Sequence, residues 1–348
     1  VTPEEAEAVL ANDQADLVGM ARAFIADADW MVKVERGESQ RIRLCTGCNQ
    51  VCLGFAGRGL PAGCNINPEA GRERELPPLE PAASKKRVAV IGGGPAGLEC
   101  ARVAAERGHT VSLHEASNQL GGALRLAASS PHREEMASTI AWWDSELSIL
   151  GVDVHLNSHV ENPDDLDADE VVWATGAEAA SMWQMRFRPS LVDGIAGTQG
   201  IPHGRDVLAG KATVSGQVLI IDEEGNFPAL NLAESLAAMN DVTEVTVATN
   251  SPLLGMPDLF ITGEFALFAA RLKQAGVKVI TGTFIDRVGN NVATTTEGED
   301  LGPFDSIVLS LGAASTPVPE GLDGIGDCIA PRDLWAAVQD GAHKGRAL

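Results

Sequence analysis

The feature that most constrains the fold is a glycine turn between an apolar segment and a helix. Residues 87–91 form a short continuous apolar run, and the sequence GGGPAG follows at 92–97, which fits G-x-G-x-x-G. The run predicts a buried strand; a helix is expected over 96–107 and a second strand over 110–114. A strand, a helix and a strand at this spacing predict a parallel βαβ unit, and therefore an α/β fold.

The glycines of this turn have separate physical roles. Gly92 permits the tight turn, Gly94 lets the backbone approach a pyrophosphate, and Gly97 lets the helix pack on the strand. The start of the helix supplies free N–H groups and its dipole. Glu115, at the end of the second strand, is expected to accept hydrogen bonds from ribose hydroxyls, and an acid there disfavours a 2′-phosphate. The residues predicted to bind an adenine nucleotide are therefore Gly92, Gly94, Pro95, Ala96, Gly97 and Glu115.

A second unit repeats this scheme more loosely. Strands are predicted over 217–222, 242–248 and 277–280, with helices over 231–239 and 265–275. Where a second glycine turn should stand, the sequence reads IIDEEGNFPA, and three acidic residues bring negative charge to the place of a pyrophosphate. Binding of NAD(P) by this unit is therefore not expected, and the unit is interpreted as a scaffold.

A quartet of cysteines precedes both units. Cys45, Cys48, Cys52 and Cys64 follow the spacing C-x2-C-x3-C-x11-C. Thiolates are soft ligands that suit iron–sulfur clusters or zinc, and zinc sites more often pair two C-x2-C knuckles, of which one is present here. The spacing predicts a [4Fe-4S] cluster with these four ligands, and a zinc site is the alternative. Backbone amides of residues 54–59 are expected to donate to cluster sulfurs. Cys100 and Cys328 are predicted to be packing residues.

Charge and composition exclude several classes of partner. The formal net charge of −22 makes nucleic acid an unfavourable ligand, because phosphate binding needs clustered Lys and Arg. The charge is interpreted as an aid to solubility, with an acidic docking face for a basic electron carrier as the alternative. No apolar stretch approaches about 20 residues, so no membrane span is predicted. No secretory signal is visible at the N-terminus, and clustered cysteines without export signals indicate the cytoplasm.

The N-terminal segment reads as the end of a larger unit. A helix capped by Thr2 is predicted to run to about residue 12, followed by a strand over 16–20 and a helix over 29–36. These elements cannot bury two faces alone, so they are expected to pack on something absent from the chain. The expected organisation is 1–44 for this segment, 45–75 for the cysteine loop, 76–86 for a linker, 87–205 and 286–348 for the first nucleotide domain, and 206–285 for the degenerate second domain.

A family resemblance joins these motifs. Residues 15–30 look like the last strand and helix of an old-yellow-enzyme-type flavin barrel. The cysteine loop, the glycine turn, the sequence LGG at 120–122 and GDCIAPR at 326–332 then follow in order. That order resembles the iron–sulfur flavoproteins that include trimethylamine dehydrogenase, histamine dehydrogenase and 2,4-dienoyl-CoA reductase. The resemblance implies the end of a (β/α)8 barrel, an iron–sulfur loop and two interleaved Rossmann-like three-layer domains.

The resemblance also implies cofactor contacts. Ala21 and Arg22 match the segment that contacts the FMN phosphate, and an Arg suits that role as a charge-assisted ligand. Gly121 and Gly122 would pass close to the dinucleotide. Asp327 would reach the ribityl or pyrophosphate region at the N-terminus of the last helix, where it would also serve as an N-cap. The first nucleotide site would hold FAD or only ADP, and FMN would be shared with the missing barrel. The family's catalytic residues lie on earlier barrel strands, so none is expected here.

The degenerate second turn is similar to that of the amine dehydrogenases of this group, whereas the cysteine spacing leans towards the reductases. The leading hypothesis is the electron-transfer portion of an oxidoreductase containing FMN and a [4Fe-4S] cluster, of the amine dehydrogenase or N-demethylase type. Its expected partners are a barrel-containing subunit or segment carrying FMN and an electron-transfer flavoprotein or similar carrier, and an oligomer is expected. The alternatives are an NAD(P)H-dependent reductase module, as in the small subunit of glutamate synthase, and a non-catalytic structural subunit with ADP and zinc.

Overall fold

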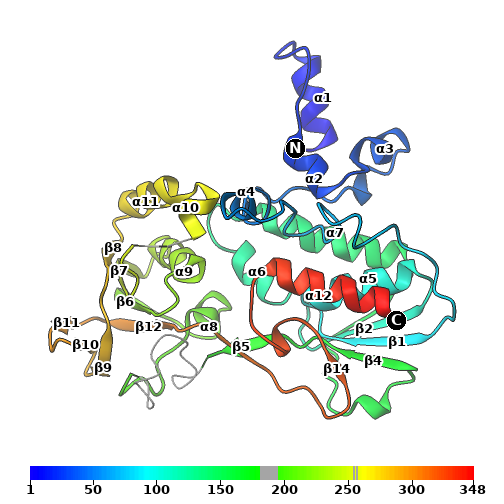
Figure 1. Ribbon diagram of the computed structural model, residues 1–348. Coiled ribbons are helices and arrows are strands. Elements are labelled where there is room, and N and C mark those ends of the chain that lie inside the picture. Colours follow the sequence, from blue (N-terminus) through cyan, green and yellow to red (C-terminus); the bar gives the residue numbers. More distant parts are fainter. Residues whose placement is uncertain (181–194, 254, 256–257) are drawn as a thin grey trace. The chain divides into compact units, whose positions relative to one another are not determined.

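The structure is a computed structural model that describes residues 1–180, 195–253, 255 and 258–348 (Figure 1). Residues 181–194, which the sequence assigned to the first nucleotide domain, lie outside the described residues. The chain divides into two compact units: unit 1 is 1–125, 134–177 and 315–348, and unit 2 is 126–133 and 178–314. The chain therefore leaves the first unit and returns to it, as an interleaved arrangement requires.

Unit 1 is built on a parallel sheet with the strand order β14-β4-β1-β2-β3. Its strands are β1 (Arg87–Ile91), β2 (Thr110–Glu115), β3 (Asp153–Leu156), β4 (Glu170–Trp173) and β14 (Asp323–Gly324). The central strand β1 is buried from Val88 to Ile91, as a strand covered on both faces should be. The predicted βαβ unit is confirmed: β1 and β2 are parallel neighbours, and the helix between them is α5 (Pro95–Glu106).

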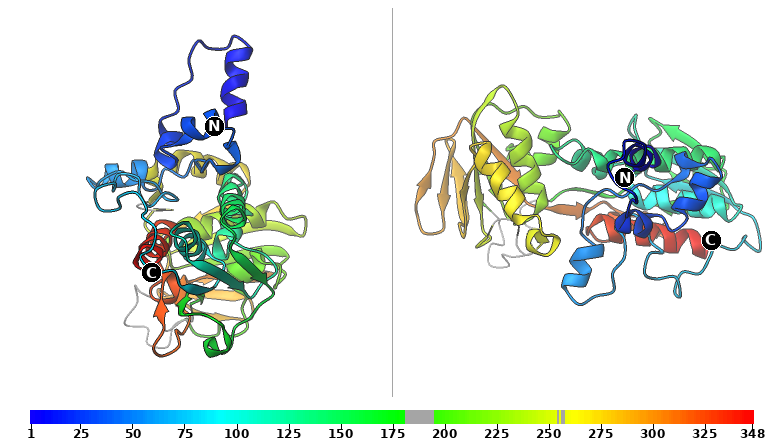
Figure 2. Two further views of the ribbon diagram at one scale, coloured as in Figure 1. Left: turned by 90° about the vertical axis from the view of Figure 1, so that its right-hand side faces the viewer. Right: turned by 90° about the horizontal axis from the view of Figure 1, so that it is seen from above.

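Helices α7 (Glu135–Ile149) and α12 (Leu334–Ala347) belong to the same unit, together with the short elements η2 (Pro163–Asp165) and η4 (Gly326–Cys328). The short helix α6 (Ala123–Ala128) begins in unit 1 and ends in unit 2. Helix α12 packs directly on α5 (Figure 1), and the right-hand view of Figure 2 shows the two helices side by side. Glycines allow this approach, since a Cβ at Gly341 would lie 2.3 Å from the Ala96 carbonyl oxygen and one at Gly345 2.7 Å from Val103 Cβ.

The N-terminal segment holds α1 (Pro3–Ala11), α2 (Ala21–Ala26), α3 (Trp30–Glu35), η1 (Ser39–Arg41) and α4 (Cys52–Gly57). Thr2 caps α1 in a capping box with Glu5, as predicted. The strand predicted over 16–20 is wrong: the backbone there is irregular, and Leu17 is 86% exposed. A strand needs a hydrogen-bonding neighbour, and within the described residues this segment has none.

Unit 2 is built on a parallel sheet with the order β12-β6-β7-β8. Its strands are β6 (Gly216–Asp222), β7 (Val242–Thr249), β8 (Lys278–Ile280) and β12 (Ser306–Ser310), and its helices are α8 (Gly204–Leu208), α9 (Phe227–Ala237), α10 (Asp258–Thr262) and α11 (Phe265–Gln274). A small antiparallel sheet joins β9 (Ile285–Gly289), β10 (Val292–Thr295) and β11 (Asp300–Leu301). The strands β5 (Ala177–Ala179) and β13 (Ala313–Ser315) pair where the chain crosses between the units.

The chain returns to unit 1 later than the sequence indicated. The boundary was expected at residue 286, with the strand near 305–311 already in the first domain, but β12 pairs with β6 in unit 2. The reason is burial: Ile307, Val308 and Leu309 are at most 7% exposed and complete the apolar cores on the sheet of unit 2. Helix α9 also begins four residues before its predicted start, because Asn226 caps it and Pro228 suits its first turn.

Candidate functional site

The four cysteines of the predicted cluster site line one cavity of unit 1. Cys52 begins α4, and the other three lie on the irregular segments before and after this helix. The residues that line the cavity are Arg22, Ile25, Cys45, Thr46, Cys48, Asn49, Val51, Cys52, Cys64 and Asn65. Tertiary folding therefore brings together the thiols that the spacing selected, including Cys64 from the far end of the loop.

Hydrogen-bond donors point at three of these sulfurs. The amide of Gly47 donates to Cys45 Sγ at 3.4 Å. Burial raises the pKa of Cys48, while the Gln50 amide and the Thr46 hydroxyl lower it. Burial likewise raises the pKa of Cys64 to about 11, against the lowering effect of the Ile66 and Asn67 amides. Such donors would stabilise thiolate sulfur and tune a metal that it binds.

The donor set fits a metal–sulfur group by its chemistry, because four soft thiols share one cavity and backbone amides are aimed at the sulfurs. In the part of the chain that the structure describes, no three Cys, His, Asp or Glu side chains already stand in the arrangement of a metal site. The expected donors at 54–59 are wrong for Gly54, Phe55, Arg58 and Gly59. These amides donate to backbone carbonyls within and beside α4, since the segment is helical.

Arg22, predicted to contact an FMN phosphate, lies on α2 at the cysteine cavity. Its guanidinium donates to the side-chain oxygen of Asn49 at 2.7 Å and to the carbonyl of Gly47 at 3.4 Å. It therefore braces the cysteine loop against α2. Ala21, its neighbour, is exposed at the first position of the same helix. Contact of these two residues with FMN stays a prediction.

The glycine turn after β1 has the geometry that its spacing predicted. A Cβ at Gly92 would lie 2.2 Å from the Ala174 carbonyl oxygen, and one at Gly97 would lie 2.0 Å from the Gly92 carbonyl oxygen. A Cβ at Gly94 would meet nothing within 4 Å among the described residues. The first and third glycines are thus required by packing, while the second faces open space at the N-terminus of α5, beside Pro95 and Ala96.

Glu115 and the second glycine pair lie against this turn. The carboxylate of Glu115 accepts from the Gly93 amide at 2.8 Å and from the Ser117 amide at 2.7 Å. The amide of Gly121 donates to the Gly93 carbonyl at 2.7 Å, and a Cβ at Gly122 would lie 3.1 Å from Gly94 Cα. A carboxylate has about four acceptor positions, so Glu115 keeps capacity for ribose hydroxyls.

Asp327 lies on η4, close to the same helix start. A Cβ at the preceding Gly326 would be 2.7 Å from Ala96 Cβ, which places η4 against the first turn of α5. Asp327 accepts from the Arg332 amide at 3.1 Å, whereas Asp333 caps α12 by accepting from the Ala336 amide at 2.8 Å. The expectation that Asp327 stands at the N-terminus of the last helix is therefore wrong, because the chain runs six residues further before α12 begins.

The corresponding turn of unit 2 is filled by the chain itself. The carboxylate of Asp222, at the end of β6, accepts from the Glu224 and Gly225 amides at 3.0 and 3.1 Å. Asn226 then caps α9 by accepting from the Phe227 amide at 2.8 Å. Burial raises the pKa of Asp222 and, together with the charge of Asp222, that of Glu224. Amides that would receive a phosphate are thus occupied by carboxylate and amide oxygens.

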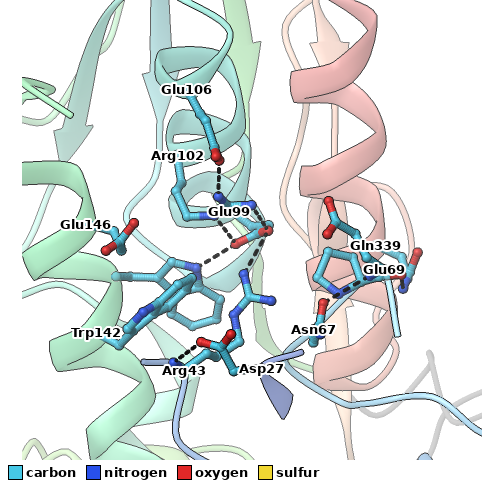
Figure 3. A network of polar contacts seen from close by, with 12 residues as sticks. Asp27, Arg43, Asn67, Glu69, Glu99, Arg102, Glu106, Trp142, Glu146 and Gln339 are labelled. Carbon is cyan, nitrogen blue, oxygen red and sulfur yellow. Dashed lines mark hydrogen bonds and ion pairs between the residues drawn. The ribbon is translucent and has the colours of Figure 1, made fainter. Parts of the chain in front are cut away.

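A buried polar network beside the cysteine cavity escaped the sequence analysis (Figure 3). Glu99, on α5, is fully buried, and it accepts from Arg102 at 2.8 and 3.1 Å and from the Trp143 indole at 2.8 Å. Arg43, two residues before the first cysteine, forms an ion pair with Glu99 at 3.7 Å. The available signal was charge at positions 99 and 102 in the middle of a mostly apolar helix.

The remaining cysteines are buried packing residues, as predicted. Cys100 lies in the middle of α5, where burial raises its pKa to about 12. Cys328 is 4% exposed and donates to the Ile325 carbonyl at 3.0 Å. Among the helices that the structure describes, none is long and apolar enough to cross a membrane.

The chain is similar in sequence and fold to known oxidoreductases. The family model described as pyridine nucleotide-disulphide oxidoreductase matches residues 9–187. A bilirubin reductase of Mediterraneibacter gnavus is 34% identical over 330 residues, covering 90% of this chain and 47% of the relative. An N,N-dimethylglycine/sarcosine dehydrogenase of Chromohalobacter salexigens is 32% identical over 392 residues, covering 97% of this chain and 55% of the relative.

A solved histamine dehydrogenase from Rhizobium sp. 4-9 has the same fold, with a TM-score of 0.89 at 22% identity over 100% of this chain and 54% of that chain. The chain spans about half the length of the curated relatives it matches. The resemblance to the group that includes histamine dehydrogenase is confirmed. Since the matched model covers just over half of the chain and includes the glycine turn, the chain belongs to the pyridine nucleotide-disulphide oxidoreductase family, a family of oxidoreductases.

Proposed function

We propose that the chain is the electron-transfer portion of an oxidoreductase containing FMN and a [4Fe-4S] cluster, of the amine dehydrogenase or N-demethylase type. The observation that carries this proposal is the single cavity lined by Cys45, Cys48, Cys52 and Cys64. The dehydrogenase relative, which aligns with 97% of this chain, supports the choice of reaction class.

A bound cluster would supply single-electron transfer between a flavin and an external acceptor. The chain's own residues would hold and shield it. The four cysteines would ligate the irons, and the amide of Gly47 would stabilise the sulfur of Cys45. Arg22 would keep the loop in place through its hydrogen bond to Asn49.

The first nucleotide site would hold the FAD expected of this family, or ADP alone. The N-terminus of α5 faces open space at Gly94, and helix dipole and free amides favour a pyrophosphate there. Glu115 would accept hydrogen bonds from the ribose. FMN would be shared with a barrel-containing subunit or segment, and an electron-transfer flavoprotein or similar carrier would take the electrons.

Anaerobic purification followed by cofactor extraction tests the proposal. We expect iron and acid-labile sulfide at about four each per chain, as four cysteine ligands imply, together with an adenine nucleotide. Zinc without labile sulfide would contradict the proposal and support a structural subunit instead. Extraction also separates FAD from ADP in the first site.

A second candidate function is an NAD(P)H-dependent reductase module. The bilirubin reductase relative, at 34% identity, favours it, whereas the occupied amides at Asp222 count against it. Stopped-flow mixing of the flavin-loaded chain with NADH or NADPH separates the two functions. Slow or absent flavin bleaching is expected; rapid bleaching would favour the reductase module.

A further inference from the structure

Arg43 is a buried cation whose charge is only partly matched by its protein neighbours. The side chain is 8% exposed, and its nearest carboxylate contact is Glu99 Oε1 at 3.7 Å. That carboxylate is engaged more closely by Arg102, at 2.8 and 3.1 Å. Within the described residues, Nε of Arg43 has no hydrogen-bond partner.

The surroundings hold this cation firmly in place. Its guanidinium carbon lies 4.2 Å from the centre of the Trp142 ring, a cation–π distance. Its own backbone amide donates to Asp27 Oδ2 at 2.8 Å, and Figure 3 shows Arg43 between Asp27 and Glu99. A buried charge is costly unless it is paired, so a cation fixed with incomplete pairing calls for a further negative partner.

The cysteine cavity begins close to Arg43 along the chain, because Cys45 lines it. Arg43 precedes Cys45 by two residues, and its charge acts electrostatically on Cys64, which lines the cavity. For Arg43 itself, burial lowers the pKa most; Glu99 raises it, Arg102 lowers it, and Cys64 and Asp27 raise it. Four thiolates around a metal–sulfur group would carry net negative charge, and that charge would increase on reduction.

We propose that Arg43, positioned by Glu99 and Trp142, is the buried counter-charge of the cysteine-ligated group and raises its reduction potential. The proposal rests on the cluster of the proposed function. A cation favours the more negative, reduced state, and Coulomb interactions are strong in a buried site. Glu99 opposes this effect, because its negative charge partly neutralises Arg43. Arg43 is thus a positioning and tuning residue rather than a metal ligand.

Removing the charge of Arg43 and removing that of Glu99 should shift the reduction potential in opposite directions. A purely structural role of the two residues would not give opposite shifts. In R43Q, the reduced-to-oxidised ratio of the cluster at a fixed potential should fall at least about threefold, which is a shift to more negative potential. R43K keeps the charge and should retain most of the wild-type ratio. E99Q removes the opposing charge while its amide oxygen still accepts from Trp143, so the ratio should rise.

The measurement is an EPR-monitored redox titration of the anaerobically purified, cluster-loaded chain. R41Q is the matched control, because Arg41 pairs with Glu146 at 2.9 Å in the same region, and it should leave the potential unchanged. Equal potentials for R43Q and R41Q, or shifts of R43Q and E99Q in the same direction, would overturn the proposal. If R43Q does not fold, E99Q decides: without a rise the proposal fails.

The test separates this proposal from the proposed function. A wild-type chain without iron and labile sulfide overturns both. A wild-type chain that carries the cluster, but whose potential is the same in R43Q as in the control, overturns only the role of Arg43.

Discussion

At the scale of single residues, the chemistry of this chain is set by how each charge and thiol is paired. Glu99 shows the rule: burial alone would raise its pKa, but the charges of Arg102 and Arg43 outweigh burial and lower it. Asp222 and Glu224 show the opposite case: burial raises both pKa values, and the charge of Arg205 lowers that of Glu224 without reversing the shift. An ionised carboxylate is therefore favourable at the position of Glu99 in unit 1, whereas it costs folding free energy at Asp222 and Glu224 in unit 2.

Replacing a cavity cysteine should abolish the metal–sulfur site. C48S should reduce the iron content of the purified chain to near background, because three thiolates cannot complete the ligand set. C100A is the control: Cys100 is fully buried away from the set, so this change should keep the iron and cost only about 1 kcal/mol of unfolding free energy. Equal loss of iron in both variants, measured by metal analysis, would contradict the assignment.

The raised pKa of Glu224 predicts in which direction the stability of the fold changes with pH. Its folded pKa exceeds its ordinary value of 4.5, so its stabilising contribution is complete below pH 4.5 and is lost as the pH rises through the folded pKa. E224Q removes this ionisation while its amide keeps the contact with Ser310. The variant should have the higher denaturation midpoint at pH 8, and the difference should shrink towards pH 4. A constant difference across that range would contradict the assignment.

At the scale of elements, the N-termini of α5 and α9 follow the corresponding strand of each unit but differ in whether their backbone amides are free. Helix α5 begins at a glycine turn that leaves its N-terminus facing open space, whereas α9 begins at Asn226, whose side chain accepts from the first amide. Asp222 occupies the amides just before it. A helix N-terminus binds an anion only when its amides are free, so we expect the two units to differ in nucleotide binding although their strand orders follow one scheme.

Two glycines of the turn before α5 should separate folding from binding. G94A places a Cβ in open space at a φ of −81°, so its unfolding free energy should change by less than about 1 kcal/mol. Its affinity for ADP should fall at least about tenfold, or about 1.4 kcal/mol, because the Cβ would take the position proposed for the pyrophosphate. G97A should instead destabilise the fold, since its Cβ would meet the Gly92 carbonyl at 2.0 Å. Calorimetry measures both quantities, and unchanged ADP affinity in G94A would refute the site.

The contact between α12 and α5 should be intolerant of an added methyl group. In G341A, the new Cβ would lie 2.3 Å from the Ala96 carbonyl oxygen, and backbone cannot move aside as a flexible side chain does. The variant should lose about 1–3 kcal/mol of unfolding free energy. G19A is the control, because a Cβ there meets nothing within 4 Å among the described residues. Equal denaturation midpoints for the two variants would show that the helices are not packed this closely.

At the scale of the whole molecule, the chain spans about half the length of the curated relatives it matches. In the N-terminal segment, Leu17 is 86% exposed, Met31 48% and Phe24 40%. Exposed apolar side chains of this kind are typical of a surface that contacts another protein part. We propose that a flavin barrel like that of the resembling flavoproteins covers this segment.

The isolated chain should therefore show the absorbance of a cluster without turning over a substrate. The resemblance places the catalytic residues on earlier barrel strands, and FMN would bind mainly to the barrel. The measurement is an amine-dependent assay with an artificial electron acceptor, with the chain alone and with a barrel-containing protein added. Turnover by the chain alone would contradict the proposed division of labour.

The sequence by itself determined the features that depend on local spacing. The run 87–91 with its glycine turn fixed the βαβ unit, and the order of motifs identified the family, because both are written in consecutive residues. The cysteine spacing selected four thiols that do share one cavity.

Only the tertiary structure decided which distant groups meet. The strand β12 lies in unit 2 because it pairs with β6, which is about ninety residues earlier in the chain. Nothing in a strand's own sequence specifies which strand it will pair with. The pairing of Arg43 with Glu99 likewise joins side chains from two segments that are far apart in the sequence. Long-range contacts are stabilised by packing and burial, and this stabilisation is gained only when the chain has folded.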